Sequence, residues 1–209
     1  MCFIQVFIES IFILEGVFIV MSETKVPVGI SARHVHVSRA DLDILYGEGY
    51  QLTFKKALKQ GGQFAAEERV DLVTEKSTLK NVSILGPIRP QTQVEISLSD
   101  ALKFKLSIPV RDSGDLHDSP GITIVGPKGS VEIKEGVIAA GRHIHMNPAE
   151  AAAFDVKDKD IVKVRCGGER GLVFENVLIR VHETYNLEFH IDTDEANASK
   201  CSGIVEVIK

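Results

Sequence analysis

The sequence lacks tryptophan and has only three tyrosines in 209 residues, so it offers few aromatic platforms on which single-stranded nucleic acid could stack. Its three cysteines are far apart and form neither a Cys-x-x-Cys pair nor the disulfide framework of a secreted protein, which fits a reducing cytoplasm. Long blocks of one charge are also missing, and the net charge is −5. We therefore expect a protein that does not bind nucleic acid.

Several catalytic signatures are absent as well. The chain has no Gly-x-Ser-x-Gly or Ser-x-x-Lys motif, which disfavours a serine nucleophile. The segment RCGGERG at 165–171 lacks the Lys-Ser/Thr pair of a phosphate-binding loop, and DTDEAN at 192–197 lacks the glycine and final glutamate of a calcium loop. We read DTDEAN as a capped turn into a short helix. Cys166 has no base paired with it in the sequence, so we expect a partly buried thiol at a strand end.

The first twenty residues are apolar and contain no lysine or arginine, so they lack the charged start of a signal peptide. Glu9 and Glu15 interrupt the run and argue against a membrane span. Three interpretations stay open: a translation start placed ahead of a true start at Met21, an amphipathic docking helix, or a buried terminal segment. We treat residues 1–21 as an apolar N-terminal extension, a misassigned start or a targeting segment, with no catalytic role.

The rest of the chain consists mostly of short apolar runs bounded by Gly, Pro, Asn or Asp, which predicts a mainly β fold. Helical signals are few. Ser38 can cap a helix that has Asp41 three residues later, and Asn147 can cap one that starts at Pro148 and has Glu150 at the matching position. We expect two short helices, one after each of these caps.

The chain contains one motif twice, Arg-His-x-His, at residues 33–36 and 142–145. In both places an apolar run precedes the motif and a helix cap follows it. We interpret the repeat as a duplicated unit and not as chance, because three residues of the motif are identical and both copies are followed by a helix cap. We infer two small β-barrel domains related by pseudo-twofold symmetry, each capped by short helices.

Each His-x-His places two imidazoles on one face of a strand, because side chains i and i+2 point the same way. Two such edges facing each other can hold one or two metal ions, with further ligands from His190 in LEFHID or from a carboxylate such as Glu95 in TQVEIS. Imidazole and carboxylate without a thiolate favour zinc. His117 and His182 have no such pattern and are expected to be ordinary histidines. Arg89 in GPIRPQTQ can bind a phosphate with two hydrogen bonds, but taken alone we interpret it as a surface side chain.

From about Val26 to the C-terminus the sequence resembles the PduL-type phosphotransacylases, the phosphate propanoyltransferases of propanediol utilisation. The segments that carry the resemblance occur in the family's order: GISARHVHVS, GPIRPQTQVEIS, RDSGDLHDSPGI, GVIAAGRHIHM and HIDTDEANA. The resemblance implies that a strand near 22–32 is exchanged into the C-terminal barrel. The implied domains are residues 22–32 plus 141–209, and residues 33–140.

The resemblance also implies a site with two zinc ions between the domains. The matching ligands of one ion are His34, His36 and Glu95, and those of the other ion are His143, His145 and His190. Arg89 matches the phosphate-binding arginine of the family, in place of the surface reading, and is the candidate catalytic residue. The matching coenzyme A contacts are Ser31, Lys56, Leu85 and Asn197. At Ser83, where the resemblance leads us to expect a basic contact, the sequence departs from the pattern.

The implied reaction converts an acyl-CoA, propionyl-CoA or acetyl-CoA, and phosphate into an acyl phosphate and coenzyme A by direct attack of phosphate. Two alternatives are a zinc-dependent hydrolase of thioesters or phosphoesters and a catalytically silent scaffold protein of a microcompartment. Free acid as the product would indicate the first, and no turnover the second. We expect a homodimer in the cytoplasm, or inside a bacterial microcompartment with shell or enzyme partners. The N-terminal extension is a poor match to an encapsulation helix.

Overall fold

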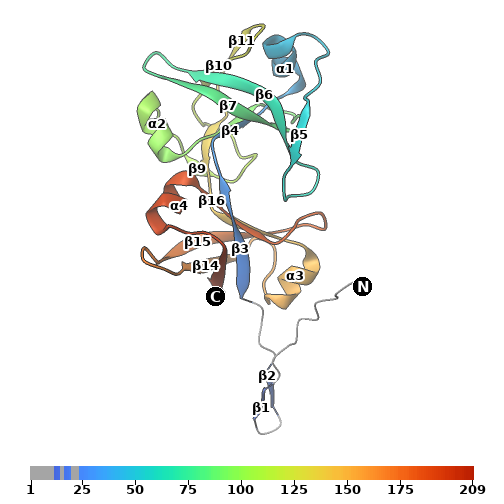
Figure 1. The fold of residues 1–209 in the computed structure, drawn as a ribbon, viewed down its shortest axis with the longest axis vertical. Helices are drawn as coiled ribbons and strands as arrows, with labels where there is room; N and C mark the ends of the chain where they lie inside the picture. Colours follow the sequence, from blue (N-terminus) through green and yellow to red (C-terminus); the bar gives the residue numbers. More distant parts are fainter. Residues whose placement is uncertain (1–11, 15–16, 20–23) are drawn as a thin grey trace.

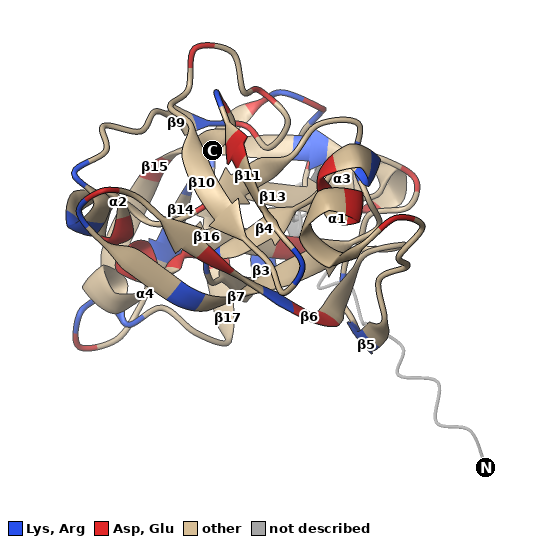
Figure 2. Cartoon of the chain, turned by 90° about the horizontal axis from the view of Figure 1, so that it is seen from above, with Lys and Arg blue, Asp and Glu red and all other residues tan. Residues whose placement is uncertain are grey.

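The computed structural model describes residues 12–14, 17–19 and 24–209. It confirms the mainly β fold: two β-rich halves lie one above the other in Figure 1, with short helices at their edges. In this part of the chain, no helix has the length and apolar character that crossing a bilayer requires. Lysines and arginines alternate with acidic residues over the cartoon in Figure 2, as the interleaved charges of the sequence indicate.

The C-terminal half closes into a six-stranded barrel in which each strand pairs with two others. Around the barrel the strands are β13 (His143–Met146), β15 (Leu172–Val181), β14 (Ile161–Cys166), β17 (Ile204–Ile208), β3 (Lys25–Ser31) and β16 (Glu188–Asp192). The early strand β3 runs parallel to β16 and antiparallel to β17. An early segment of the chain is thus a strand of the barrel that the C-terminal half forms, and the domain bounds stay a prediction.

The N-terminal half is built on a nine-stranded sheet that curves as a half-barrel. In order across the sheet its strands are β11 (Ser130–Ile133), β10 (Ile122–Val125), β6 (Phe64–Val73), β7 (Thr78–Gly86), β4 (His34–His36), β8 (Gln93–Glu95), β12 (Val137–Ala140) and β9 (Val110–Arg111), with β5 (Phe54–Ala57) paired to β6. Each half has its own apolar core, one around Val35 and Phe104 and the other around Ile144 and Phe189.

Short capped helices follow the strands that carry the histidine motifs. The predicted caps form: the Ser38 side chain accepts from the Asp41 N–H at the start of α1 (Arg39–Tyr46), and Asn147 forms a capping box at the start of α3 (Pro148–Ala153). DTDEAN also forms the expected capped helix, α4 (Thr193–Ser199). The sequence analysis missed α2 (Leu98–Phe104), whose cap is Ser97.

The structure differs from the sequence-based expectations at Cys166 and in the N-terminal extension. Cys166 is not a free thiol: it forms a disulfide with Cys201, and the prediction from the cysteine spacing was wrong. The fold brings the end of β14 beside the segment after α4, with 5.7 Å between the two Cα atoms, and no local spacing indicates this. Within the N-terminal extension, β1 (Phe12–Leu14) and β2 (Val17–Ile19) pair as antiparallel strands where a docking helix was one alternative. The remainder of residues 1–21 lies outside the described residues.

Candidate functional site

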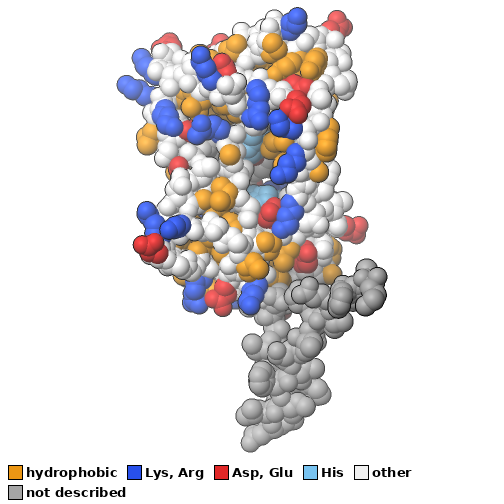
Figure 3. Space-filling model, in the orientation of Figure 1, with side chains coloured by type: hydrophobic (Ala, Val, Ile, Leu, Met, Phe, Trp, Pro, Cys, Tyr) orange, Lys and Arg blue, Asp and Glu red, His pale blue; other side chains and the backbone are white. Residues whose placement is uncertain are grey.

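A cavity of about 540 Å³ lies between the two halves and is lined by residues from both. Histidine side chains are visible in the hollow near the middle of the face in Figure 3, and lysines and arginines gather around it. Five of the seven histidines of the chain face this cavity. They are His34, His36, His143, His145 and His190.

The N-terminal half contributes a cluster of two imidazoles and one carboxylate. His34 and His36 lie on β4, and Glu95 lies directly opposite His34 on the neighbouring strand β8. Ligand atoms of the three side chains all lie within 4.8 Å of one another, and all three side chains are buried. His34 Nε2 is 3.5 Å from Glu95 Oε2. The strand register thus brings together residues that are about sixty positions apart in the sequence.

The C-terminal half contributes a cluster of three imidazoles with the same layout. His143 and His145 lie on β13, and His190 lies directly opposite His143 on β16. Their ligand atoms also lie within 4.8 Å of one another. His143 Nε2 and His145 Nε2 are 3.0 Å apart. Two nitrogens bound to one tetrahedral zinc ion would be ~3.3 Å apart, so this edge fits such an ion.

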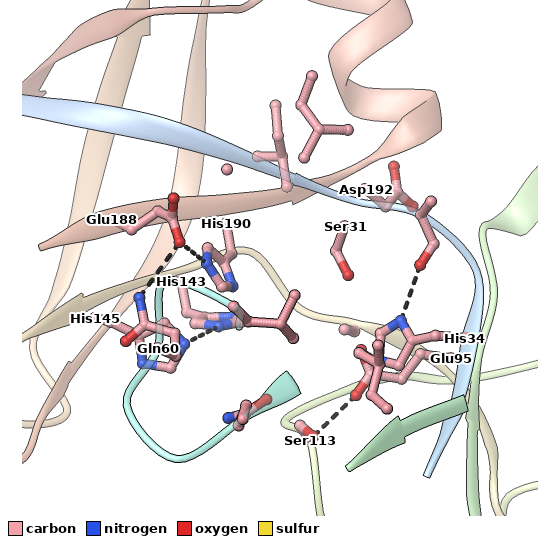
Figure 4. A pocket seen from close by; sticks show the side chains of 18 of the residues that line it. Ser31, His34, Gln60, Glu95, Ser113, His143, His145, Glu188, His190 and Asp192 are labelled. Carbon is pink, nitrogen blue, oxygen red and sulfur yellow. Dashed lines mark hydrogen bonds and ion pairs between the residues drawn. The ribbon is translucent and has the colours of Figure 1, made fainter. Parts of the chain in front are cut away.

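The first histidine of each motif is held in the tautomer that a metal ligand needs. His34 Nδ1 is 2.8 Å from the carbonyl oxygen of Ala32, and His143 Nδ1 is 2.8 Å from that of Gly141. A carbonyl oxygen has no proton to give, so Nδ1 must donate in both rings. In the neutral ring the lone pair is therefore on Nε2, which in His143 faces His145 and the cavity (Figure 4) and in His34 faces the Glu95 carboxylate.

Burial keeps most of these rings neutral. It lowers the pKa of His36 to about 3, that of His143 to about 4 and that of His145 to about 2, and the charge of a neighbouring histidine adds to the effect. His34 differs: burial alone would lower its pKa, but the charge and hydrogen bond of Glu95 outweigh this and raise it. Burial would likewise raise the pKa of Glu95, yet His34 lowers it. The three histidines whose pKa is lowered can therefore bind a cation without first losing a proton.

Comparison with known proteins identifies the family. A family model described as phosphate propanoyltransferase matches residues 27–202. The chain belongs to this family. A phosphate propanoyltransferase of Thermotoga maritima is 56% identical over 178 residues, which is 85% of this chain and 85% of that protein. Phosphate propanoyltransferases of Lachnoclostridium phytofermentans (51% identical; 88% and 87% covered) and Rhodopseudomonas palustris (53% identical; 83% and 77% covered) are also similar. As a member of this family, the chain is an acyltransferase.

Arg89, the candidate phosphate ligand of the family pattern, lies beside the N-terminal cluster. Its Nη1 atom donates to Ser113 Oγ at 3.0 Å and to Gln93 Oε1 at 3.4 Å. Ser113 Oγ in turn donates to Glu95 Oε1 at 2.9 Å. The side chain lines the cavity and is half-buried, and burial lowers the pKa of the guanidinium from its usual range. Arg89 is therefore a cation in the cavity, and not a surface side chain.

The four residues matched to coenzyme A contacts separate into two groups. Ser31 and Leu85 line the cavity, whereas Lys56 and Asn197 are exposed and lie outside its lining. Ser83, where the resemblance leads us to expect a basic contact, also lines the cavity. It lies opposite Arg69 on β6, and Arg69 Nη1 donates to Ser83 Oγ at 2.5 Å. A guanidinium therefore still lies beside this position.

The arginine of each Arg-His-x-His motif pairs with the helix that follows the third cluster residue. Arg33 Nε is 2.6 Å from Asp100 Oδ2 of α2, and Arg142 Nε is 2.7 Å from Glu195 Oε1 of α4. Both acids hold the third position after the helix cap. The two helices meet where the Ser99 N–H donates to Asp194 Oδ2 at 2.8 Å. The repeated arginine therefore ties its strand to a helix, a role that the sequence analysis missed.

Proposed function

We propose that the protein converts acyl-CoA and phosphate into acyl phosphate and coenzyme A at a site that holds two zinc ions, one in each cluster. The observation that carries the proposal is the pair of three-residue clusters with equal layout on one cavity, with Arg89 beside them. Family membership supports the acyl transfer, and the donor sets support the metal. Propionyl-CoA is the first substrate to test, and acetyl-CoA differs from it by one methylene, which is worth only ~1–3 kcal/mol in a pocket.

Zinc would be held by His34, His36 and Glu95 in one half and by His143, His145 and His190 in the other. When bound, it supplies a Lewis acid that polarises a thioester carbonyl and stabilises a thiolate. Three protein ligands leave a coordination position open in each cluster, which is typical of catalytic and not of structural zinc sites.

Arg89 binds and orients phosphate in this proposal. A guanidinium binds two phosphate oxygens at once, and Ser113 and Gln93 hold it in place by hydrogen bonds. A phosphate oxygen forms the new bond to the acyl carbon, the C–S bond breaks, and coenzyme A leaves as the thiolate. Phosphate is already an anion, so aligning it and offsetting charge repulsion matter more than removing a proton.

Ser31, Leu85, Lys56 and Asn197 would contact coenzyme A. Ser31 and Leu85 lie on the cavity lining and can reach the thioester end of the substrate. Lys56 and Asn197 are exposed and suit the outer, charged part of the molecule. A homodimer, in the cytoplasm or inside a microcompartment, completes the proposal, and sedimentation analysis of the full chain tests the oligomer.

The decisive assay follows release of coenzyme A from propionyl-CoA and acetyl-CoA with and without phosphate, on protein whose zinc has been counted. We expect release that requires phosphate, stops after chelation and returns when zinc is added back. Release without phosphate, with free acid as product, would instead indicate a zinc-dependent hydrolase. No release from metal-loaded protein would indicate a silent scaffold.

A further inference from the structure

The third residue of each cluster has a polar partner two positions earlier on its own strand. Gln93 Nε2 donates to Glu95 Oε1 at 2.5 Å. His190 Nε2 donates to Glu188 Oε2 at 2.6 Å, a bond that Figure 4 shows. Alternation along a strand places i and i−2 on one face. Gln93 lies opposite His36, and Glu188 lies opposite His145, so the two partners hold equivalent places in the two halves.

The carboxylate holds opposite places in the two pairs. In the N-terminal half the cluster residue is a carboxylate and its partner is a neutral amide. In the C-terminal half the cluster residue is an imidazole and its partner, Glu188, is the carboxylate. We propose that Glu188 is a positioning residue that fixes His190 as a metal ligand and supplies the negative charge that Glu95 supplies directly in the other half. This inference rests on the proposed metal site.

Glu188 determines which nitrogen of His190 is left for an ion. An ionised carboxylate only accepts hydrogen bonds, so Nε2 of His190 carries the proton and the lone pair is on Nδ1. His143 has the opposite arrangement, because its Nδ1 donates to a backbone carbonyl. A carboxylate that accepts from a ligand imidazole also makes the ring a stronger donor to the metal.

The surroundings of Glu188 hold its carboxylate in place. Gln60, which is 3% exposed, donates from Nε2 to Glu188 Oε2 at 3.3 Å and to the carbonyl of Asn186 at 3.0 Å. Lys59 Nζ lies 3.6 Å from Glu188 Oε1. Both carboxylate oxygens therefore have partners from the loop between β5 and β6, which belongs to the other half of the molecule.

A glycine on the adjacent strand leaves room for this carboxylate. Gly29 lies opposite His190 in the register of β3 and β16. A Cβ atom at Gly29 would come within 2.7 Å of Glu188 Cδ, closer than real contacts allow. A side chain at position 29 would therefore force the Glu188 side chain to shift.

The test measures zinc affinity at each of the two clusters by competition with a chromophoric chelator, with cobalt absorption bands as a second readout. Glu188→Gln keeps the shape and removes the charge. We expect it to weaken the zinc affinity of the C-terminal cluster by ~10–100-fold, the usual effect of losing a residue that holds a metal ligand in place. The zinc affinity of the N-terminal cluster should not change. Glu175→Gln on the exposed face of β15 is the matched control and should change neither affinity.

A second variant tests the exchange of charge directly. Glu188→Gln with His190→Glu rebuilds in the C-terminal half the Gln-x-Glu pair of the N-terminal half. We expect this double variant to bind two zinc ions again, with cobalt bands that shift because a carboxylate replaces an imidazole. If Glu188→Gln retains both affinities, or if the double variant binds no better than the single one, the inference is wrong while the metal site stands. If the unaltered protein binds no zinc, the proposed function fails as well.

Discussion

The two halves of the molecule build the same three-residue cluster with different chemistry. In both halves, two histidines lie on one strand, and a third residue lies on the neighbouring strand directly opposite the first histidine. The third residue is Glu95 in the N-terminal half and His190 in the C-terminal half. The register has thus been kept while the residue type has changed. Strand pairing therefore sets the layout of each cluster. The charge of each cluster is set by the third residue and its partner two positions earlier on the same strand.

The surroundings of the two clusters also differ. Beside the N-terminal cluster lies Arg89, held by Ser113 and Gln93. Beside the C-terminal cluster lies Tyr185, whose ring centroid is 4.4 Å from that of His145. A guanidinium lies beside the C-terminal cluster as well, because Arg180 lies opposite His145 on β15 and its charge lowers the pKa of both His143 and His145. Because Arg89 is the proposed phosphate ligand, we expect phosphate to be held nearer the N-terminal cluster.

Removing one histidine from either half should have the largest effect on bound zinc and on turnover. We expect His34→Ala and His143→Ala each to reduce bound zinc from two ions to one and to lower turnover by more than the ~10–100-fold typical of an outer partner. Metal counting and phosphate-dependent coenzyme A release on the same samples test this. Full activity in a variant that has lost an ion would contradict a site that needs both halves.

Arg89 should distinguish the phosphate side of the site from the rest. Arg89→Ala removes charge-assisted hydrogen bonds worth ~1.5–3 kcal/mol, so we expect kcat/KM for phosphate to fall by roughly 10–150-fold. The KM for acyl-CoA should change little. Arg89→Lys keeps the charge without the planar fork and should be intermediate. Equal weakening of both substrates would show that Arg89 does not act through phosphate.

The two motif arginines allow a sharper comparison of stability. The Asp100 side chain is 2% exposed and that of Glu195 is 19% exposed, so losing the arginine leaves a more deeply buried carboxylate in the N-terminal half, with Lys103 Nζ still 2.9 Å from Asp100 Oδ1. We expect Arg33→Ala to lower the free energy of unfolding by ~1–3 kcal/mol and Arg142→Ala by less. Urea unfolding of both variants measures this. A larger loss for Arg142→Ala would mean that burial of the acid does not decide the effect.

In the metal-free protein, acid should affect the first histidines of the two clusters differently. The pKa of His143 is lowered to about 4 from an ordinary 6.5, so between these values the unfolded chain binds a proton that the folded ring refuses. The free energy of unfolding therefore falls as pH falls, by up to about 1.4 kcal/mol per pH unit for such a ring. The pKa of His34 is raised, so its contribution is present at low pH and is lost as pH rises through the raised value.

Unfolding free energies from pH 7 to pH 5 on metal-free protein measure this difference. His143→Asn should flatten the dependence on pH, whereas His34→Asn should not. The same slope in both variants would contradict the assignment of opposite protonation behaviour to His34 and His143.

Local patterns in the sequence predict much of this arrangement. The His-x-His spacing places each imidazole pair on one strand face, and Ser38 and Asn147 mark the helices that follow. His190 and Glu95 are already candidate ligands from the residues, and the resemblance to the family assigns each of them to one ion and gives Arg89 its place in the site. The same alternation that pairs the histidines would also have identified Gln93 and Glu188, had it been applied one step before each third residue.

Other features depend on contacts that no local pattern contains. The disulfide between Cys166 and Cys201 joins segments that only the closed barrel brings together. Gln60 reaches Glu188 from the opposite half of the molecule. The pairing of Arg33 with Asp100 needs the position of α2 relative to β4. These are products of tertiary packing, so they are seen in the structure and not in the sequence.

Anomalous diffraction at the zinc absorption edge, from crystals of the metal-loaded protein, tests the central claim most directly. We predict two peaks in the cavity, one within bonding distance of His34, His36 and Glu95, and one within bonding distance of His143, His145 and Nδ1 of His190. A single peak, or a peak bound through Nε2 of His190 with Glu188 turned away, would contradict the equivalence of the two clusters with exchanged charge.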